Sequence, residues 1–148
     1  MRYPSTIVAA AALVFLAACG SDTTGPAKSD AGMSARIAGA AWNALSVATD
    51  SGPPSLLVLT GTNATASLSL IIPLGPGLGK QTVGSTTPIA AVLVMGSQSW
   101  AASRTQGGAG SLTLTTAVPG HVAGTFEFTL AHEGTERQVT SGRFDVRY

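Results

Sequence analysis

The chain of 148 residues has little charge, few aromatic side chains and a single cysteine. Charged residues make up 10% of the chain, and eight basic against seven acidic side chains leave a formal net charge of +1. This balance excludes the clustered basic surface that marks nucleic-acid-binding proteins. It also excludes a charged disordered chain, because 45% of the residues are hydrophobic. With one cysteine, an internal disulfide is excluded as well.

The first apolar run, residues 7–18, is too short for a membrane-spanning helix, which needs about 20 apolar residues. Arg2 precedes the run, and small residues end it. A basic start, a short apolar stretch and small residues at the end are typical of a secretory signal peptide. Residues 1–18 are therefore predicted to be a leader that takes no part in the fold.

The end of this run, Leu16-Ala17-Ala18-Cys19, resembles the lipobox of bacterial lipoproteins. The resemblance implies cleavage before Cys19, diacylation of its thiol and acylation of the new amino group. Each buried acyl CH₂ contributes about 0.8 kcal/mol, and more than one chain anchors stably. The alternative is a plain signal peptide followed by an incidental cysteine. Gly20 stands where Asp would signal inner-membrane retention in Gram-negative lipoproteins, which favours the outer membrane.

Residues 19–33 are small and polar and include Gly and Pro, so they are predicted to form a flexible tether behind the lipidated cysteine. Residues 34–148 then form the folded domain. Apolar side chains alternate with Ser, Thr and charged residues over 65–72, 111–115, 122–130 and 143–148, a period typical of half-buried antiparallel strands. The continuously apolar runs 56–59 and 90–95 suit strands buried on both faces. The best helical candidate, 38–47, is weakened by Gly39 and Asn43.

Turn-forming residues separate these runs, at 50–54, 60–63, 73–79, 106–110 and 132–136. About nine short strands at this spacing predict an antiparallel β-sandwich or a small β-barrel. The predicted core consists of Ile37, Trp42, Leu45, Leu57, Leu59, Leu68, Leu70, Val92, Val94, Leu112, Leu114, Phe126, Phe128, Phe144 and Val146.

Three segments resemble a family of small, uncharacterised bacterial lipoproteins: residues 35–44 (ARIAGAAWNA), 122–128 (VAGTFEF) and 139–146 (VTSGRFDV). Members of that family show an x-I-x-G-x-x-W opening, a G-T-F-x-F strand and a terminal G-x-F-x-V strand. The resemblance covers most of residues 34–148 and implies an all-β domain. It implies no catalytic residues, because the family has no established activity.

Two short patterns resemble ligand sites without meeting their requirements. In the loop 75–82, Gln81 stands where a phosphate-binding loop needs Ser or Thr, and Leu74, just before the loop, stands where it needs Gly. The sequence His-Glu-Gly-Thr-Glu at 132–136 lacks the second histidine of a zinc protease, and it is predicted to form a hairpin tip. His121 and His132 are expected at opposite ends of one strand. No metal or cofactor is predicted.

Carboxylates are scarce, because no Asp or Glu occurs between Asp50 and Glu127. Glycoside hydrolysis needs two carboxyl groups about 5 to 10 Å apart. Glu127 and Asp145 can approach each other if the last two strands pair, but Arg143 and Arg147 beside them favour a cross-strand ion pair. No serine lies in a G-x-S-x-G pattern. The chain is therefore not predicted to be an enzyme.

The two tryptophans differ in their sequence neighbours. Trp42 lies among small residues and is predicted to be in the core. Trp100 follows Ser97, Gln98 and Ser99, which makes it a candidate contact residue for a ligand or partner, with burial in the core as the alternative.

Together these patterns predict a lipoprotein of the bacterial cell envelope that acts as a non-enzymatic binding or interaction module. Its expected partners are the membrane, through acylated Cys19, and an envelope protein or small ligand. The periplasmic and the surface side are both left open. The alternative is a carrier that holds a small apolar ligand in a β-barrel cavity.

Overall fold

The computed structural model describes residues 32–52, 55–84 and 89–148. The expected signal peptide, Cys19 and most of the expected tether lie outside these ranges. Within them the chain forms eleven strands and no helix, so the prediction of an all-β antiparallel fold is confirmed. The strands outnumber the nine expected, and the first begins at Gly32, ahead of residue 34.

No helix in the described ranges is long and apolar enough to cross a membrane.

The strands, in chain order, are β1 (Gly32–Ile37), β2 (Ala40–Asn43), β3 (Ser46–Ser51), β4 (Leu56–Thr62), β5 (Ser67–Pro73), β6 (Gly79–Thr82), β7 (Ala90–Met95), β8 (Gln98–Ala102), β9 (Ala109–Val118), β10 (His121–His132) and β11 (Thr135–Arg147).

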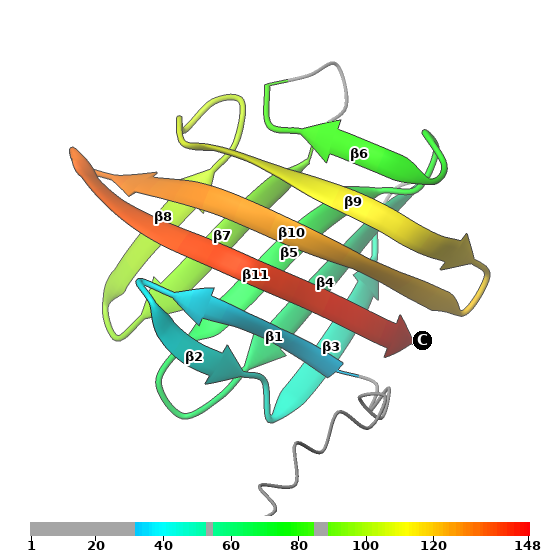
Figure 1. Cartoon of the computed structure of the whole chain (residues 1–148), viewed down its shortest axis with the longest axis horizontal. Helices are drawn as coiled ribbons and strands as arrows, with labels where there is room; N and C mark the ends of the chain where they lie inside the picture. The colour runs from blue at the N-terminus through cyan, green and yellow to red at the C-terminus, as the bar shows by residue number, and fades with distance from the viewer. Residues whose placement is uncertain (1–31, 53–54, 85–88) are drawn as a thin grey trace, which may run out of the picture.

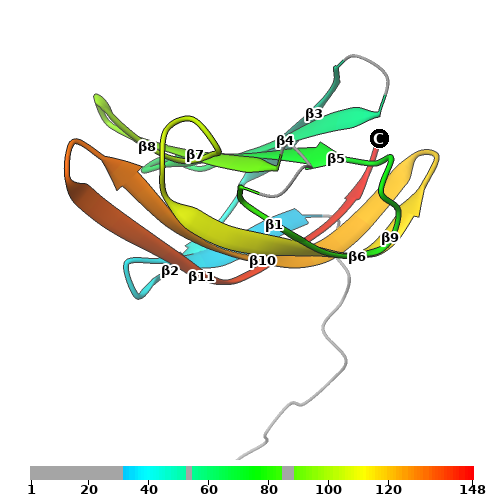
Figure 2. The same ribbon diagram turned by 90° about the horizontal axis from the view of Figure 1, so that it is seen from above.

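One antiparallel sheet contains all the strands, and it curls strongly into a half-barrel (Figures 1 and 2). We call the strands β2-β1-β11-β10-β9-β6 the front sheet and β8-β7-β5-β4-β3 the back sheet. β10 joins the two, because it pairs with β9 over most of its length and with β8 at Ala131 and Ala101. The two sheets therefore face each other, and their strands cross in the view of Figure 1.

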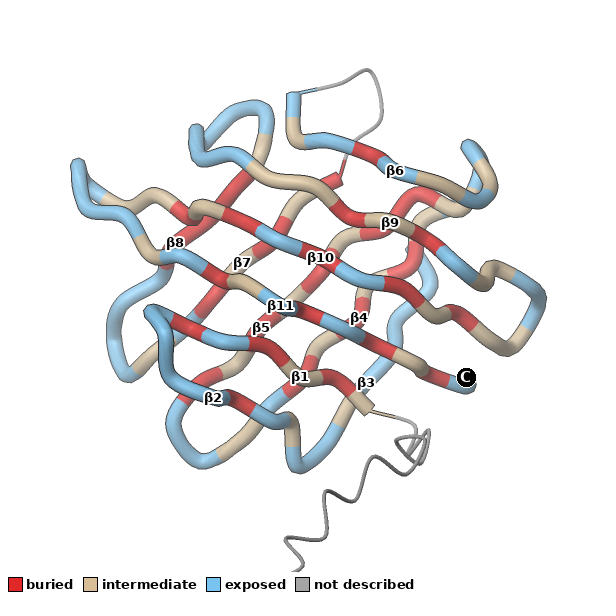
Figure 3. The backbone as a smooth tube through the Cα atoms, in the orientation of Figure 1, coloured by how far each residue is buried: buried red, intermediate tan, exposed pale blue. Residues whose placement is uncertain are grey.

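The core fills the space between the two sheets. Buried side chains alternate with exposed ones along the strands, as the banding in Figure 3 shows. In the back sheet the inward residues are mostly leucine and isoleucine, and in the front sheet they include every phenylalanine of the described ranges. The alternation seen in the sequence over 65–72, 111–115, 122–130 and 143–148 therefore correctly predicts which side chains face inward, except for Tyr148, which follows β11 and is exposed.

Phenylalanine and glycine face each other in three cross-strand pairs of the front sheet. Phe126 pairs with Gly142, Phe144 with Gly124, and Phe128 with Gly110. A Cβ atom on Gly142 would overlap the ring of Phe126, and one on Gly124 would lie 2.9 Å from Cζ of Phe144. Each ring thus occupies space left by the missing side chain. The G-T-F-x-F and G-x-F-x-V patterns have a structural reason: their glycines accommodate the phenylalanines of the neighbouring strand.

Three residues predicted for the core are not buried: Val92 and Val94 of β7, and Leu45. Val94 is 41% exposed and Val92 is half-buried, because in β7 the inward positions are Ala91 and Leu93. A uniformly apolar run gives no period from which the inward face could be read. Likewise, Leu57 and Leu59 of β4 are buried, while Leu56 and Val58 are half-buried rather than covered on both faces. The other predicted core residues, apart from Leu45, are buried.

Leu45 is 83% exposed because it lies in the short connection between β2 and β3, where its N–H donates to the carbonyl of Thr62 at 2.8 Å. The segment 38–47, the best helical candidate of the sequence, forms a turn, β2 and the beginning of β3. Its tryptophan, Trp42, is buried as predicted. Strand pairing with β1 and β4 therefore overrides the weak local preference for a helix.

Candidate functional site

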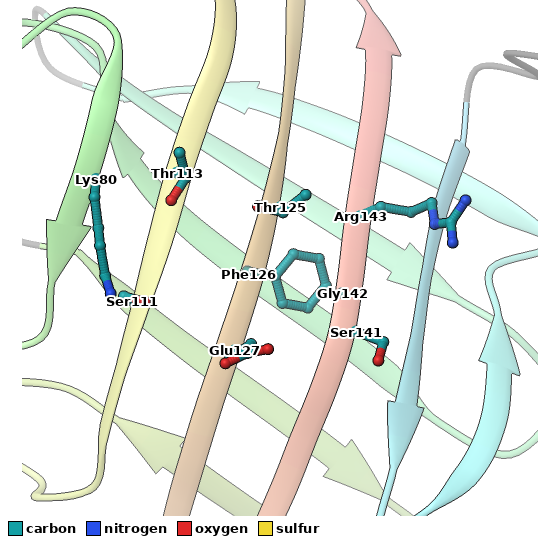
Figure 4. Close-up of a pocket in the computed structure, with 9 residues that line it drawn as sticks. All are labelled: Lys80, Ser111, Thr113, Thr125, Phe126, Glu127, Ser141, Gly142 and Arg143. Carbon is teal, nitrogen blue, oxygen red and sulfur yellow. The ribbon is translucent and has the colours of Figure 1, made fainter.

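A polar groove of about 600 Å³ crosses the outer face of the front sheet (Figure 4). We call it the Glu127 groove. Four neighbouring strands, β6, β9, β10 and β11, supply its walls. Its lining residues are Lys80, Ser111, Thr113, Thr125, Phe126, Glu127, Ser141, Gly142 and Arg143.

Strand register arranges the outward side chains of the groove in two rows. In the first row Thr113 and Thr125 are paired, with Lys80 on one side and Arg143 on the other. In the second row Glu127 is paired with Ser111 of β9. One carboxylate therefore lies among hydroxyl groups, with a cationic side chain at each flank of the groove.

The second row depends on an irregularity between β10 and β11. Phe126 pairs with Gly142 but Phe128 pairs with Val139, so β11 has an additional residue at this point. Ser141 adopts a positive φ of 51° there. A bulge of this kind turns side chains away from the regular alternation. As a result Thr140 and Ser141 both lie opposite Glu127, between the inward-facing Val139 and Gly142, and Ser141 lines the groove.

The carboxylate of Glu127 is exposed and makes no ion pair with any residue in the described ranges. Its oxygens are therefore available to accept hydrogen bonds from a ligand. The hydroxyl groups around it can both donate and accept, and the Lys80 ammonium and Arg143 guanidinium can donate. The groove thus offers every type of hydrogen-bonding group to a molecule that lies along it.

Asp145, the other carboxylate of the predicted pair, is not in the groove. β10 and β11 do pair, but Asp145 lies opposite Ala123, well along the strand from Glu127. Its Oδ1 lies 2.8 Å from Nε2 of His121. A cross-strand pair therefore does form at Asp145, but its partner is His121 and not an arginine.

The histidines lie at opposite ends of β10, as expected. Nε2 of His132 lies 3.9 Å from Oε2 of Glu133, in the turn before β11. Across the part of the chain that the structure describes, no three His, Cys, Asp or Glu side chains gather closely enough to hold a metal ion.

Trp100 lies where the two sheets join, and it is only 3% exposed. Its Nε1–H donates to Oγ1 of Thr135 at 3.2 Å, and the Thr135 hydroxyl donates to the carbonyl of His132 at 2.7 Å. The guanidinium carbon of Arg137 lies 4.9 Å from the centre of the indole ring. These contacts fasten β8 to the hairpin of β10 and β11. A contact role for Trp100 toward a partner stays a prediction, and its buried ring leaves little surface for one.

Two further pockets also open on outer faces. One of about 300 Å³ continues the Glu127 groove and shares Ser111 and Glu127 with it. The other, of about 450 Å³, lies over β7, β8 and β10 and includes Val92 and His132. The carrier alternative requires an apolar cavity between the sheets, and none of these three pockets lies there.

The sequence alone points to Glu127 and to Arg143 near it, but it does not show which hydroxyl groups and which second cation line the groove with them. The alternation of β9 and β10 correctly places Thr113, Thr125 and Glu127 on the outer face. Nothing in the sequence, however, shows that Lys80 lies across β9 from them, because β6 is a short strand after a loop.

The structure establishes a class of fold, an antiparallel sheet of eleven strands curled into a half-barrel. The chain matches no family model, no curated protein and no solved structure. The role of the groove therefore has to be inferred from its own chemistry.

Proposed function

We propose that this chain is a lipid-anchored protein of the bacterial cell envelope, that its domain is a non-enzymatic binding module, and that the Glu127 groove is its ligand site. The anchor is acylated Cys19, supported by the lipobox-like residues before it and by its being the sole cysteine. Gly20 after the cysteine supports the outer membrane as its location.

The observation that carries the proposed binding site is the arrangement of polar groups on a rigid sheet. Glu127 lies among the hydroxyl groups of Ser111, Thr113, Thr125 and Ser141 in a groove of about 600 Å³. Small-molecule sites commonly have about 300 to 1,000 Å³. A carboxylate and several hydroxyl groups match a ligand rich in hydroxyl groups, and the flanking cations match carbonyl or carboxylate substituents. We therefore propose a glycan segment as the ligand class.

Binding without cleavage is supported by the distribution of carboxylates. Enzymes that hydrolyse glycosides place two carboxyl groups on either side of the scissile bond, about 5 to 10 Å apart. Glu127 is the one carboxylate among the residues that line the groove. Asp145 is paired with His121 farther along the sheet. The groove can thus hold a sugar chain, but it lacks the second group that hydrolysis requires.

Replacement of the Glu127 carboxylate by an amide tests the site. The mature domain is titrated with chitotetraose and with cellotetraose, and amide chemical shifts are followed by NMR. We expect shifts to cluster at residues 111–113 and 125–127. Glu127→Gln should weaken binding by about 10- to 100-fold, because a hydrogen bond to a charged group is worth about 1.5 to 3 kcal/mol.

Asp50→Asn is the matched control, since it makes the same chemical change on the back sheet. It should leave the affinity unchanged. Equal affinities of Glu127→Gln and the unaltered protein, or shifts that cluster away from the groove, would contradict the proposed site. The anchor has a separate test: mass spectrometry should find two or three acyl chains on Cys19, and Cys19→Ser should release the protein from the membrane.

A further inference from the structure

Three of the large hydrophobic side chains most exposed to solvent lie toward one end of the molecule. Leu78 is 64% exposed, Val118 is 53% exposed and Tyr148 is 44% exposed. Leu78 precedes β6, Val118 ends β9, and Tyr148 follows β11. Figure 1 shows the beginning of β6 and the ends of β9 and β11 on the same side of the molecule.

Strand register places Val118 and Tyr148 next to each other. Val118 pairs with His121, and His121 pairs with Arg147. The N–H of Tyr148 donates to the carbonyl of Gly120 at 3.0 Å. The turn between β9 and β10 and the end of β11 therefore form one surface, which we call the tether end.

The first described residue, Gly32, belongs to the same end. It begins β1 and pairs with Asp145 on β11, close to Arg147 and Tyr148. Residues 20–31 separate it from Cys19, and at about 3.3 to 3.6 Å per residue the chain from Cys19 to Gly32 reaches at most about 47 Å. An anchor at Cys19 is therefore attached to the domain at the tether end.

We propose that the tether end docks on the surface of the lipid bilayer. This proposal rests on the proposed acylation of Cys19, and it adds the orientation of the domain. Val118 and Leu78 supply apolar contact, and the amphipathic ring of Tyr148 suits the boundary between acyl chains and headgroups.

The charges along the molecule fit this orientation. Arg147 is exposed at the tether end and can meet lipid phosphates, and Asp145 beside it is paired with His121. Glu133 and Glu136 lie at the opposite end, in and after the turn between β10 and β11. Arg137 lies beside Glu136, so the opposite end carries charges of both signs, whereas Arg147 is the exposed charge next to Tyr148. The Glu127 groove, on the side of the molecule, remains open to a ligand.

Two exposed valines provide the test. Val118→Cys places a thiol at the tether end, and Val94→Cys places one on the back sheet at a site of similar exposure, 41%. Because Cys19 is the sole native cysteine and is consumed by acylation, each variant has one free thiol. The acylated proteins are labelled with an environment-sensitive fluorophore. They are then reconstituted in vesicles of phosphatidylethanolamine and phosphatidylglycerol at 3:1.

Nitroxide-bearing lipids in these vesicles should quench the label at position 118 at least twofold more than the label at position 94. Equal quenching would mean that the tether end does not meet the lipid in preference to the back sheet, and stronger quenching at position 94 would mean that the back sheet meets the lipid. Either result overturns the docking while leaving the anchor intact. Absence of acylation by mass spectrometry, together with failure to float with the vesicles, would overturn the anchor and the docking together.

Discussion

The front and back sheets enclose one core, yet they present different outer faces to solvent. In the back sheet, the strands carry one charged residue, Asp50, on the edge strand β3. The strands of the front sheet carry Arg36, Lys80, Glu127, Glu136, Arg137, Arg143, Asp145 and Arg147. Both inner faces are apolar, so the difference in charge between the two outer faces plays no part in forming the core.

Hydroxyl groups also serve different purposes on the two faces. On the back sheet they bond to one another across strands: Oγ1 of Thr60 lies 2.9 Å from Oγ of Ser69, and Oγ1 of Thr62 lies 3.2 Å from Oγ of Ser67. On the front sheet the hydroxyl groups of Thr113 and Thr125 line a groove beside an unpaired carboxylate. The back sheet thus pairs its hydroxyl groups with one another, and the front sheet leaves those of the groove available to a ligand.

The largest effect is expected from the inner face of the front sheet. Gly142→Ala should lower the free energy of unfolding by about 2 to 3 kcal/mol, because the added methyl group overlaps the ring of Phe126 and overpacking costs about 1 to 3 kcal/mol. Gly75→Ala is the control, since its new Cβ would lie 3.8 Å from the nearest atom, on Ser55. Urea denaturation measures both. Similar stabilities of the two variants would show that the ring of Phe126 does not need the space beside Gly142.

A smaller effect is expected where the sheets join. Trp100→Phe removes the hydrogen bond to Thr135 and should cost about 1 kcal/mol more than Trp42→Phe. Nε1 of Trp42 is buried without a hydrogen-bond partner among the described residues, so Trp42→Phe removes no hydrogen bond. Thermal unfolding of the two variants gives the difference. If Trp100→Phe were the less harmful change, the indole N–H would not fasten the two sheets.

The smallest effects are expected from the cross-strand pairs of the outer faces. Double-mutant cycles should give about 0.5 kcal/mol for His121 with Asp145 and about 0.3 kcal/mol for Thr60 with Ser69. Salt at 1 M should weaken the first coupling, which includes a carboxylate, and leave the second, between two hydroxyl groups, unchanged. An equal response to salt would contradict the contrast between a charged and an uncharged face.

Much of the fold can be predicted from the sequence because alternation identifies the inward face wherever polar and apolar residues take turns. This holds for Leu68 and Leu70 in β5 and for Phe126 and Phe128 in β10. It fails for Val92 and Val94, whose strand is apolar throughout. It also misleads at Trp100, whose polar neighbours Gln98 and Ser99 are exposed residues at the beginning of β8 while the indole itself faces inward.

The groove could not be predicted, because it depends on how four strands are aligned. Glu127 is recognisable as an outward carboxylate, but its relation to Ser111, Ser141 and Lys80 follows from strand pairing and from the bulge in β11. A register shift of one residue would turn every side chain to the other face. Local sequence patterns do not determine such a shift between distant segments.

The pairing of β1 with β11 has a consequence for the order of events in the cell. Gly32 and Asp145 are neighbours although nearly the whole domain separates them in sequence. A ribosome releases β1 long before it has made β11, and pairing over such a distance is intrinsically slow. Until β11 arrives, β1 has only the short strand β2 beside it. The domain therefore completes its curled sheet only after the last strand has been made.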